Sequence, residues 1–229
     1  MLWPFVLLTI IALAIVLYTE YRESATTTNA APPQGQPRFD RRLLLAGAIA
    51  KTVASLGFVA AAVSLGAFDT FFGQTLFIAL MWSLLGDILL VFKGSRVAFT
   101  FGIAAFLMAH LGYVMLFRLR GVDTTAFLLA LAGFAGVAFF IWRWLAPHVR
   151  GGMRIAVGAY IAVITLMVAC AVGTTVALPA LLPLLAAMLF WLSDLTVARQ
   201  RFVRKSFWNR AVGLPLYFAA QYLFVALLP

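Results

Sequence analysis

The chain has 229 residues, of which 65% are hydrophobic and 10% are charged, and its formal net charge is +10. A soluble domain is about half apolar and about a quarter charged, so this composition excludes an ordinary soluble protein and predicts membrane spans. The basic residues lie in short segments between apolar runs, where membrane topology and anionic lipid explain them better than nucleic acid does. The single cysteine, Cys170, lies in an apolar run and is expected to pack as a small hydrophobe.

Eight apolar runs follow one another along the chain, each with the roughly 17–25 residues that a helix needs to cross a bilayer. The runs lack the alternation of β-barrel strands, so the pattern predicts an all-α polytopic membrane protein with eight transmembrane helices. We expect these helices at residues 2–18, 43–67, 71–92, 97–117, 124–145, 155–171, 176–198 and 211–228.

The first run lacks a basic segment before it and is long for the core of a signal peptide, so we predict a retained first helix within residues 1–21. Residues 22–42 are rich in Thr, Ala, Pro, Gln and Gly, which predicts a flexible cytoplasmic loop. The remaining residues, 43–229, are expected to supply the other seven helices of a single eight-helix membrane domain.

The positive charges lie almost entirely on one side of this predicted domain. The segments after the first, third, fifth and seventh runs hold 14 of the 17 Lys and Arg residues. The opposite side holds only Arg118 and Arg120, and Lys51 lies inside the second run. The positive-inside rule therefore places the basic segments in the cytoplasm and both termini outside, as expected for a protein of the bacterial inner membrane.

Two aspartates interrupt apolar runs, Asp87 in the third and Asp194 in the seventh. A charged side chain at membrane depth is costly, and such residues usually face the protein interior and serve a function. Each aspartate lies about 6–7 Å inside the cytoplasmic end of its helix, so we expect the two at one level. The same offset of 107 residues relates His110 to Tyr217, which suggests a 4+4 parallel repeat, although coincidence explains so thin an identity equally well.

Polar side chains on neighbouring helices could complete a site around these aspartates. Residues four apart share one face of a helix, and this spacing relates Lys51 to Ser55 and Ser83 to Asp87. We predict Asp87 and Asp194 as catalytic residues. The predicted substrate-binding residues are Lys51, Ser83, His110, Tyr113, Tyr217 and Gln221.

Each candidate also has a structural explanation. The aspartates could pair with Lys51 or with loop arginines and hold helices together, Lys51 could extend to the headgroups, and His110 could be a packed, hydrogen-bonded residue. The sequence contains no HExxH motif, Cys/His cluster, P-loop or GxSxG motif. It therefore predicts no metal, nucleotide or other cofactor, and no serine lipase.

Two blocks of the sequence resemble the YhhN/TMEM86 family, the lysoplasmalogenases. The first is SLLGDILLVFKGSRVAFTFGIAAFLMAHLGYV (83–114), and the second comprises WLSDLTVARQRF (191–202) and LPLYFAAQYLFV (214–225). Lys51 matches the family's lysine on the second helix, but Thr52 stands where the family usually has proline. The matching residues within the blocks are Gly86, Asp87, Phe106, His110, Tyr113, Ser193, Asp194, Tyr217 and Gln221.

The resemblance implies an eight-helix fold, two essential aspartates and a lysophospholipid substrate taken from the membrane. The implied reaction hydrolyses the vinyl ether bond of lysoplasmalogen to a fatty aldehyde and glycerophospho-ethanolamine or -choline. Protonation of the vinyl β-carbon leaves an oxocarbenium ion for water, so one aspartic acid has to be protonated and the other ionised. The residues by themselves leave open a proton-coupled transporter or lipid-handling protein, and a structural protein in which the aspartates only hold helices.

Overall fold

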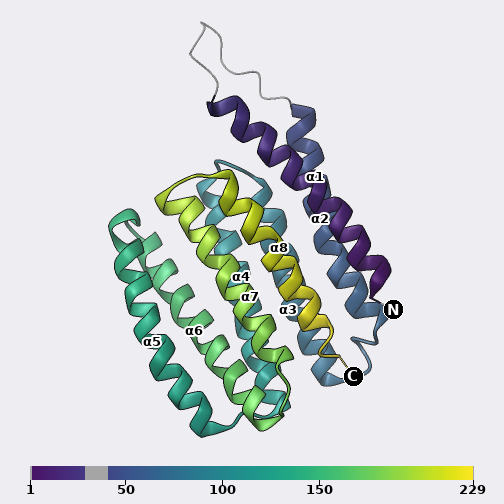
Figure 1. The fold of residues 1–229 in the computed structure, drawn as a ribbon, viewed down its shortest axis with the longest axis vertical. Coiled ribbons are helices and arrows are strands. Elements are labelled where there is room, and N and C mark those ends of the chain that lie inside the picture. Colours follow the sequence, from purple (N-terminus) through teal and green to yellow (C-terminus); the bar gives the residue numbers. More distant parts are fainter. Residues whose placement is uncertain (1, 29–40, 229) are drawn as a thin grey trace, which may run out of the picture.

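The computed structural model describes residues 2–28 and 41–228, which form a bundle of eight α-helices without strands (Figure 1). The predicted all-α architecture with eight helices is thereby confirmed. A 3₁₀ turn, η1 (Ala146–His148), follows the fifth helix, and a π-helical turn, η2 (Arg199–Val203), follows the seventh. The helices are α1 (Trp3–Thr28), α2 (Arg41–Ser64), α3 (Phe71–Val91), α4 (Arg96–Arg120), α5 (Thr124–Leu145), α6 (Met153–Ala177), α7 (Leu182–Ala198) and α8 (Phe207–Val225).

Seven helices of the described residues are long and apolar enough to cross a membrane. The remaining one is α8, whose 19 residues include Pro215 within the helix. Helices of this length and composition need a bilayer around them, so the chain is an integral membrane protein. That α8 also spans the bilayer, and that the bundle is a 4+4 repeat, stay predictions.

The boundary between α6 and α7 differs from the predicted one. α6 continues to Ala177 and α7 begins only at Leu182, whereas the apolar pattern placed the break between residues 171 and 176. The break lies at Pro179, since proline cannot continue a helix and restricts the residue before it. Gly173 stays helical and allows a close approach, because a Cβ there would meet a Val122 methyl at 2.5 Å.

The predicted loop after the first helix is shorter than expected at its start. α1 continues through Thr28, so residues 22–28 are helical, and α2 begins at Arg41. The rest of the predicted loop, residues 29–40, lies outside the described residues. The added turns of α1 place Glu23 on the same helix as Glu20, one turn apart.

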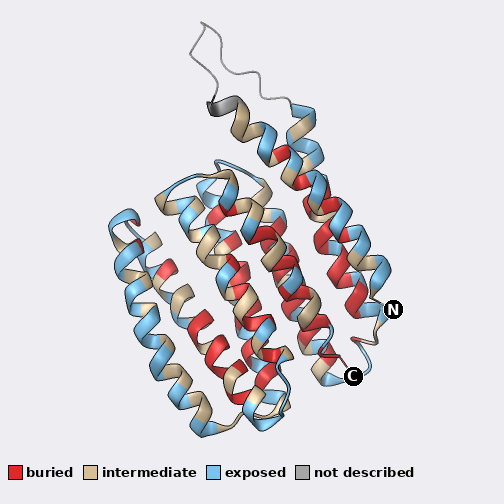
Figure 2. Ribbon diagram, in the orientation of Figure 1, coloured by how far each residue is buried: buried red, intermediate tan, exposed pale blue. Residues whose placement is uncertain are grey.

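Consecutive helices pack as pairs, with α3, α4, α7 and α8 in the middle, α5 and α6 on one side, and α1 and α2 on the other (Figure 1). Buried residues are frequent on α2, α3, α4, α6 and α8, whereas α5 buries only Leu145 (Figure 2). Its outward apolar side chains fit a lipid-facing helix. Cys170 on α6 is buried, which confirms its predicted packing role. We use the term basic end for one end of the bundle, at which α3 and α7 finish and α4 and α8 start.

Side-chain caps fix where two helices begin at the basic end. Ser95 accepts a hydrogen bond from the backbone N–H of Ala98 at 3.1 Å, and Ser206 accepts one from that of Trp208 at 3.3 Å. Serine is among the best capping residues because its oxygen satisfies a free N–H of the first turn. The caps set the starts of α4 and α8, and hence the level at which their interior residues lie.

Gly86 marks a close packing point between α3 and α4, because a Cβ there would meet the Phe106 ring at 2.6 Å. We expect Gly86→Ala to lower the free energy of unfolding by about 1–3 kcal/mol through overpacking. Gly133→Ala on α5 is the matched control, since a Cβ there meets nothing within 4 Å and alanine is the better helix former. Thermal unfolding in detergent measures the difference, and equal melting temperatures of the two variants would contradict the packing argument.

Candidate active site

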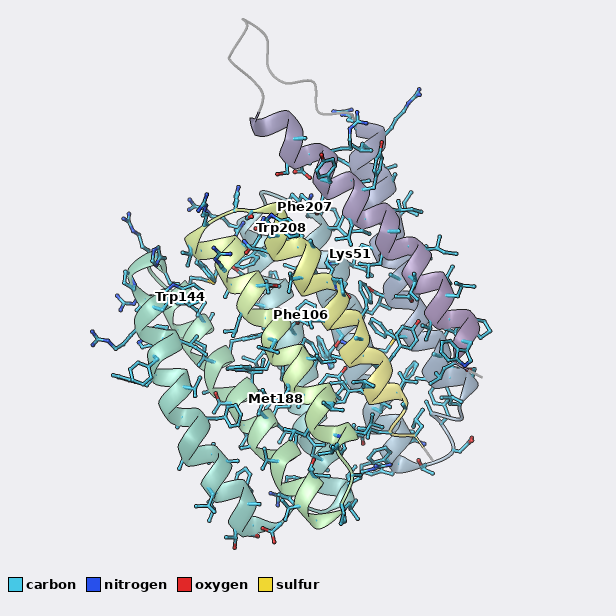
Figure 3. The ribbon with its side chains drawn as sticks, viewed as in Figure 1. Lys51, Phe106, Trp144, Met188, Phe207 and Trp208 are labelled. Atoms are coloured by element: carbon cyan, nitrogen blue, oxygen red, sulfur yellow. The ribbon has the colours of Figure 1, made fainter. Side chains whose placement is uncertain are left out.

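A cavity of about 300 Å³ opens at the basic end of the bundle, within the size range of ligand pockets. Figure 3 shows Lys51 and Phe106 in the interior of the bundle, and Phe207 and Trp208 at the start of α8 on the basic end. Six helices, α2, α3, α4, α6, α7 and α8, each supply a side chain that bears on the chemistry of the cavity. In chain order they are Lys51, Asp87, Phe106, Tyr160, Asp194 and Tyr217.

Asp87 is the centre of a buried polar cluster. Its Oδ1 lies 2.9 Å from Lys51 Nζ, and its Oδ2 accepts hydrogen bonds from Ser55 Oγ at 2.7 Å and from the Tyr217 hydroxyl at 2.6 Å. Asp87 is only 2% exposed and Lys51 8%. A buried ion pair of this kind is tolerated because additional donors satisfy the carboxylate. The three donors stabilise negative charge on Asp87.

Asp194 has a different set of partners and is more open to the cavity, with 17% of its side chain exposed. The Tyr160 hydroxyl donates to its Oδ2 at 2.7 Å, and His110 Nε2 lies 3.4 Å from the same oxygen. That imidazole contact is close but not aligned as a hydrogen bond, so His110 Nε2 has no hydrogen-bond partner among the described residues. His110 Nδ1 lies 2.5 Å from the Phe106 carbonyl oxygen, which can only accept, so Nδ1 carries a proton.

The two aspartates thus share one cavity, as the matched depths suggested, while each has its own partners. Phe190 connects the two clusters, because its ring centroid lies 4.6 Å from that of His110 and 5.3 Å from that of Tyr217. The Phe106 ring lies 5.8 Å from that of Tyr217 and completes the aromatic wall. The packed rings separate the two polar clusters and lower the local polarity, which strengthens the electrostatic interactions around the buried Asp87.

Four predicted substrate-binding residues lie behind this wall and do not line the cavity: Ser83, His110, Tyr113 and Gln221. The Tyr113 hydroxyl donates to Gln221 Oε1 at 2.6 Å, and Ser83 Oγ lies 3.4 Å from the same hydroxyl. Direct substrate contact of these four stays a prediction, because helical spacing gives a shared face without telling how far the face is buried. Lys51 and Tyr217 line the cavity.

The sequence prediction missed Ser55, Tyr160 and Phe190 as residues of the site. Ser55 had a usable signal, its spacing of four from Lys51, and its hydroxyl lies 2.7 Å from Asp87 Oδ2 and 3.1 Å from the Lys51 carbonyl oxygen. Phe190 had the same kind of signal, its spacing of four from Asp194, whereas Tyr160 lies in an apolar run with nothing nearby in the sequence to distinguish it from other core aromatics. Only the packing of α6 and α7 against α4 brings them to His110.

Charged residues surround the cavity where it reaches the basic end. Lys93 lies 2.8 Å from a carboxylate oxygen of Glu20 and 2.5 Å from one of Glu23, which ties α1 to the turn between α3 and α4. Several basic residues that the sequence explained by topology alone also line the cavity. They are Arg201, Lys205 and Arg210, from η2, the following loop and the first turn of α8.

Comparison with known proteins relates this chain to one family. The YhhN family profile matches residues 46–228, which include most of α2 and all of α3–α8. Lysoplasmalogenase TMEM86A from Bos taurus is 30% identical over 156 residues, which cover 65% of this chain and 62% of that protein. The chain thus matches less than two thirds of that relative's length, and no solved structure matches. Because the family profile covers far more than half of the chain, this integral membrane protein belongs to the YhhN family.

Proposed function

We propose that this protein is a membrane hydrolase that cleaves the vinyl ether bond of lysoplasmalogen to a fatty aldehyde and glycerophospho-ethanolamine or -choline. One observation carries the proposal: in a chain of the YhhN family, Asp87 and Asp194 open onto one cavity with unlike partners. The related Bos taurus protein, named a lysoplasmalogenase, supports the choice of substrate. Two carboxyl groups in unlike environments are suited to acid–base chemistry.

Asp194 is the acid in this proposal. His110 donates from Nδ1 to the Phe106 carbonyl, so a neutral ring turns the acceptor Nε2 toward Asp194 Oδ2. Two acceptors that face each other repel, so we assign a proton to Asp194, which lines the cavity while His110 does not. That proton is transferred from Asp194 to the β-carbon of the vinyl ether, which becomes an oxocarbenium ion.

Asp87 is the stabilising carboxylate. Its negative charge, held by Lys51, Ser55 and Tyr217, faces the cation, and it accepts a proton as water attacks the oxocarbenium carbon. The resulting hemiacetal collapses when Asp194 takes its hydroxyl proton and Asp87 returns a proton to the leaving glycerol oxygen. Aldehyde and glycerophospho product are then free, and both carboxyl groups are in their starting states.

The proposed orientation follows from the basic residues. The cavity opens at the end of the bundle that carries Lys93, Arg201 and Lys205, which the positive-inside rule assigns to the cytoplasm. Both termini then lie outside, as in the expected bacterial inner membrane. Deeper in the bundle the Tyr113 and Phe224 rings stack with centroids 3.8 Å apart. This packing favours a site entered from one side over a transporter open to both.

The reaction is tested with purified protein, lysoplasmalogen and two analogues, a saturated 1-alkyl ether and a 1-acyl ester. We expect aldehyde from the vinyl ether only, since neither analogue has a β-carbon that accepts a proton. In D₂O the aldehyde, reduced at once to the alcohol, should carry a single deuterium at C2. Aldehyde without that deuterium would contradict β-carbon protonation. Proton-coupled lipid uptake by proteoliposomes without aldehyde would favour the transporter.

A further inference from the structure

Three basic side chains line the cavity at the basic end without a carboxylate partner among the described residues: Arg201, Lys205 and Arg210. Lys93 lies on the same cavity, but the two carboxylates of Glu20 and Glu23 exceed its single positive charge by one. The uncompensated positive charge is therefore concentrated on the segment from η2 to the start of α8. Positive charge around a partly enclosed cavity attracts an anionic group of a ligand.

Arg210 gives the second, independent observation. Its Nε is buried, and no group of the described residues accepts its N–H. A buried guanidinium N–H without an acceptor is costly, and an anionic oxygen in the cavity satisfies it. The fixed fork of arginine donors matches the oxygens of a phosphate group.

The segment that carries these side chains is held in place by a closed hydrogen-bond network around Asn209, which is 4% exposed. Asn209 Oδ1 accepts from Arg199 Nη1 at 2.9 Å, and its Nδ2 donates at 2.8 Å to both Gln200 Oε1 and the Arg204 carbonyl. The guanidinium carbon of Arg201 lies 4.0 Å from the centroid of the Phe99 ring. The backbone of this segment and the Arg201 side chain are thus positioned before any ligand binds, which lowers the entropic cost of binding.

The spacing between Arg210 and the carboxylates also fits a single ligand that reaches Arg210 at one end and the carboxylates at the other. Arg210, Gly213, Leu214 and Tyr217 all line the cavity and follow the spacing of one helix face. Tyr217 follows Arg210 by seven positions, which corresponds to about 10 Å along α8. In an extended lysophospholipid the glycerol unit separates the phosphorus from the vinyl ether by a similar distance.

We propose that Arg201, Lys205 and Arg210 form a phosphate-binding site that holds the phosphodiester of the lipid headgroup. The site rests on the proposed function for its ligand, while the charges and the buried Nε of Arg210 stand without it. It fixes the headgroup at the basic end, so that the vinyl ether lies at the level of Asp87 and Asp194. Selection for a phosphate ester then precedes the chemical step.

The test measures binding, so it does not depend on cleavage. Two uncleavable ligands are compared, a 1-alkyl lysophosphatidylethanolamine and the matching 1-alkylglycerol, which lacks the phosphate. We expect Arg210→Gln and Lys205→Gln each to weaken binding of the phospholipid about 10- to 100-fold and to leave that of the alkylglycerol unchanged. Arg204→Gln is the matched control, because Arg204 is exposed in the same loop and does not line the cavity.

Equal loss for both ligands, or no loss for either, would overturn the phosphate site. Lys205 is exposed, so its variant keeps the test valid even where Arg210→Gln fails to fold. Displacement of the phospholipid by millimolar inorganic phosphate would identify a site for free phosphate as well, and no displacement would restrict it to the lipid-borne group. If the variants lose only phospholipid binding, and the wild-type protein releases no aldehyde from lysoplasmalogen, the phosphate site stands and the proposed reaction is rejected.

Discussion

Replacing Asp87 with asparagine should abolish aldehyde release and destabilise the protein at the same time. The variant leaves the Lys51 ammonium buried without its counter-charge, and breaking a buried pair in this way costs about 3–5 kcal/mol. Loss of a group that stabilises the cation and accepts a proton should lower kcat by at least about 10²–10⁴-fold. Aldehyde release and thermal unfolding in detergent measure the two effects.

A double variant separates the two roles of Asp87. Lys51→Met together with Asp87→Asn removes both charges, so most of the lost stability should return because no unpaired charge remains. Activity should not return, since the carboxylate is still absent. If the double variant regains both stability and aldehyde release, Asp87 is a structural residue and the proposed mechanism is wrong.

Replacing Asp194 with asparagine should remove activity while leaving the fold nearly as stable as before. The amide keeps the size of the side chain but cannot deliver an acidic proton, so we expect kcat to fall by about 10²–10⁴-fold. Its partners are Tyr160 and His110, and neither is a permanently charged cation as Lys51 is for Asp87. The Asp194 side chain is also 17% exposed. The melting temperature should therefore shift much less than for Asp87→Asn.

Tyr160→Phe provides the control for this second prediction. It removes the hydroxyl that bonds Asp194 Oδ2 at 2.7 Å but keeps the carboxyl group and the ring. We expect a kcat between those of the wild type and Asp194→Asn. An Asp194→Asn protein that unfolds at the same reduced temperature as Asp87→Asn, or that retains full kcat, would contradict the assignment of Asp194 as the acid.

Position along a helix could be predicted from the sequence, whereas lateral position could not. Counting residues from the end of each helix was enough to predict that Asp87 and Asp194 meet at one cavity, because a helix rises by a constant amount per residue. The lateral packing of helices depends on side-chain shape across the interface, which a single sequence does not reveal. The separate partner sets of the two aspartates therefore came only from the structure.

The same limit explains why the position of the basic residues could be predicted but their different roles could not. Lys93 and Arg201 were predicted correctly to lie at one end, since charge asymmetry depends only on order along the chain. Their different roles depend on three-dimensional neighbours: Lys93 meets the glutamates of α1, while Arg201 lies over Phe99 in the π-helical turn. A residue used for topology and one that also binds a ligand look alike in the sequence.

The attachment of α1 has a consequence for how the cavity responds to its surroundings. In the half away from the basic end, the Thr9 and Tyr222 hydroxyls lie 2.7 Å apart, and Tyr222 donates to the Phe5 carbonyl. At the basic end the attachment consists of the ion pairs of Lys93 with Glu20 and Glu23, and the Lys93 side chain is 40% exposed. Dissolved ions screen exposed charges but not hydrogen bonds between helices. Salt therefore weakens the attachment of α1 at the glutamate-bearing wall of the cavity and leaves the hydrogen bonds at Thr9 and Tyr222 intact.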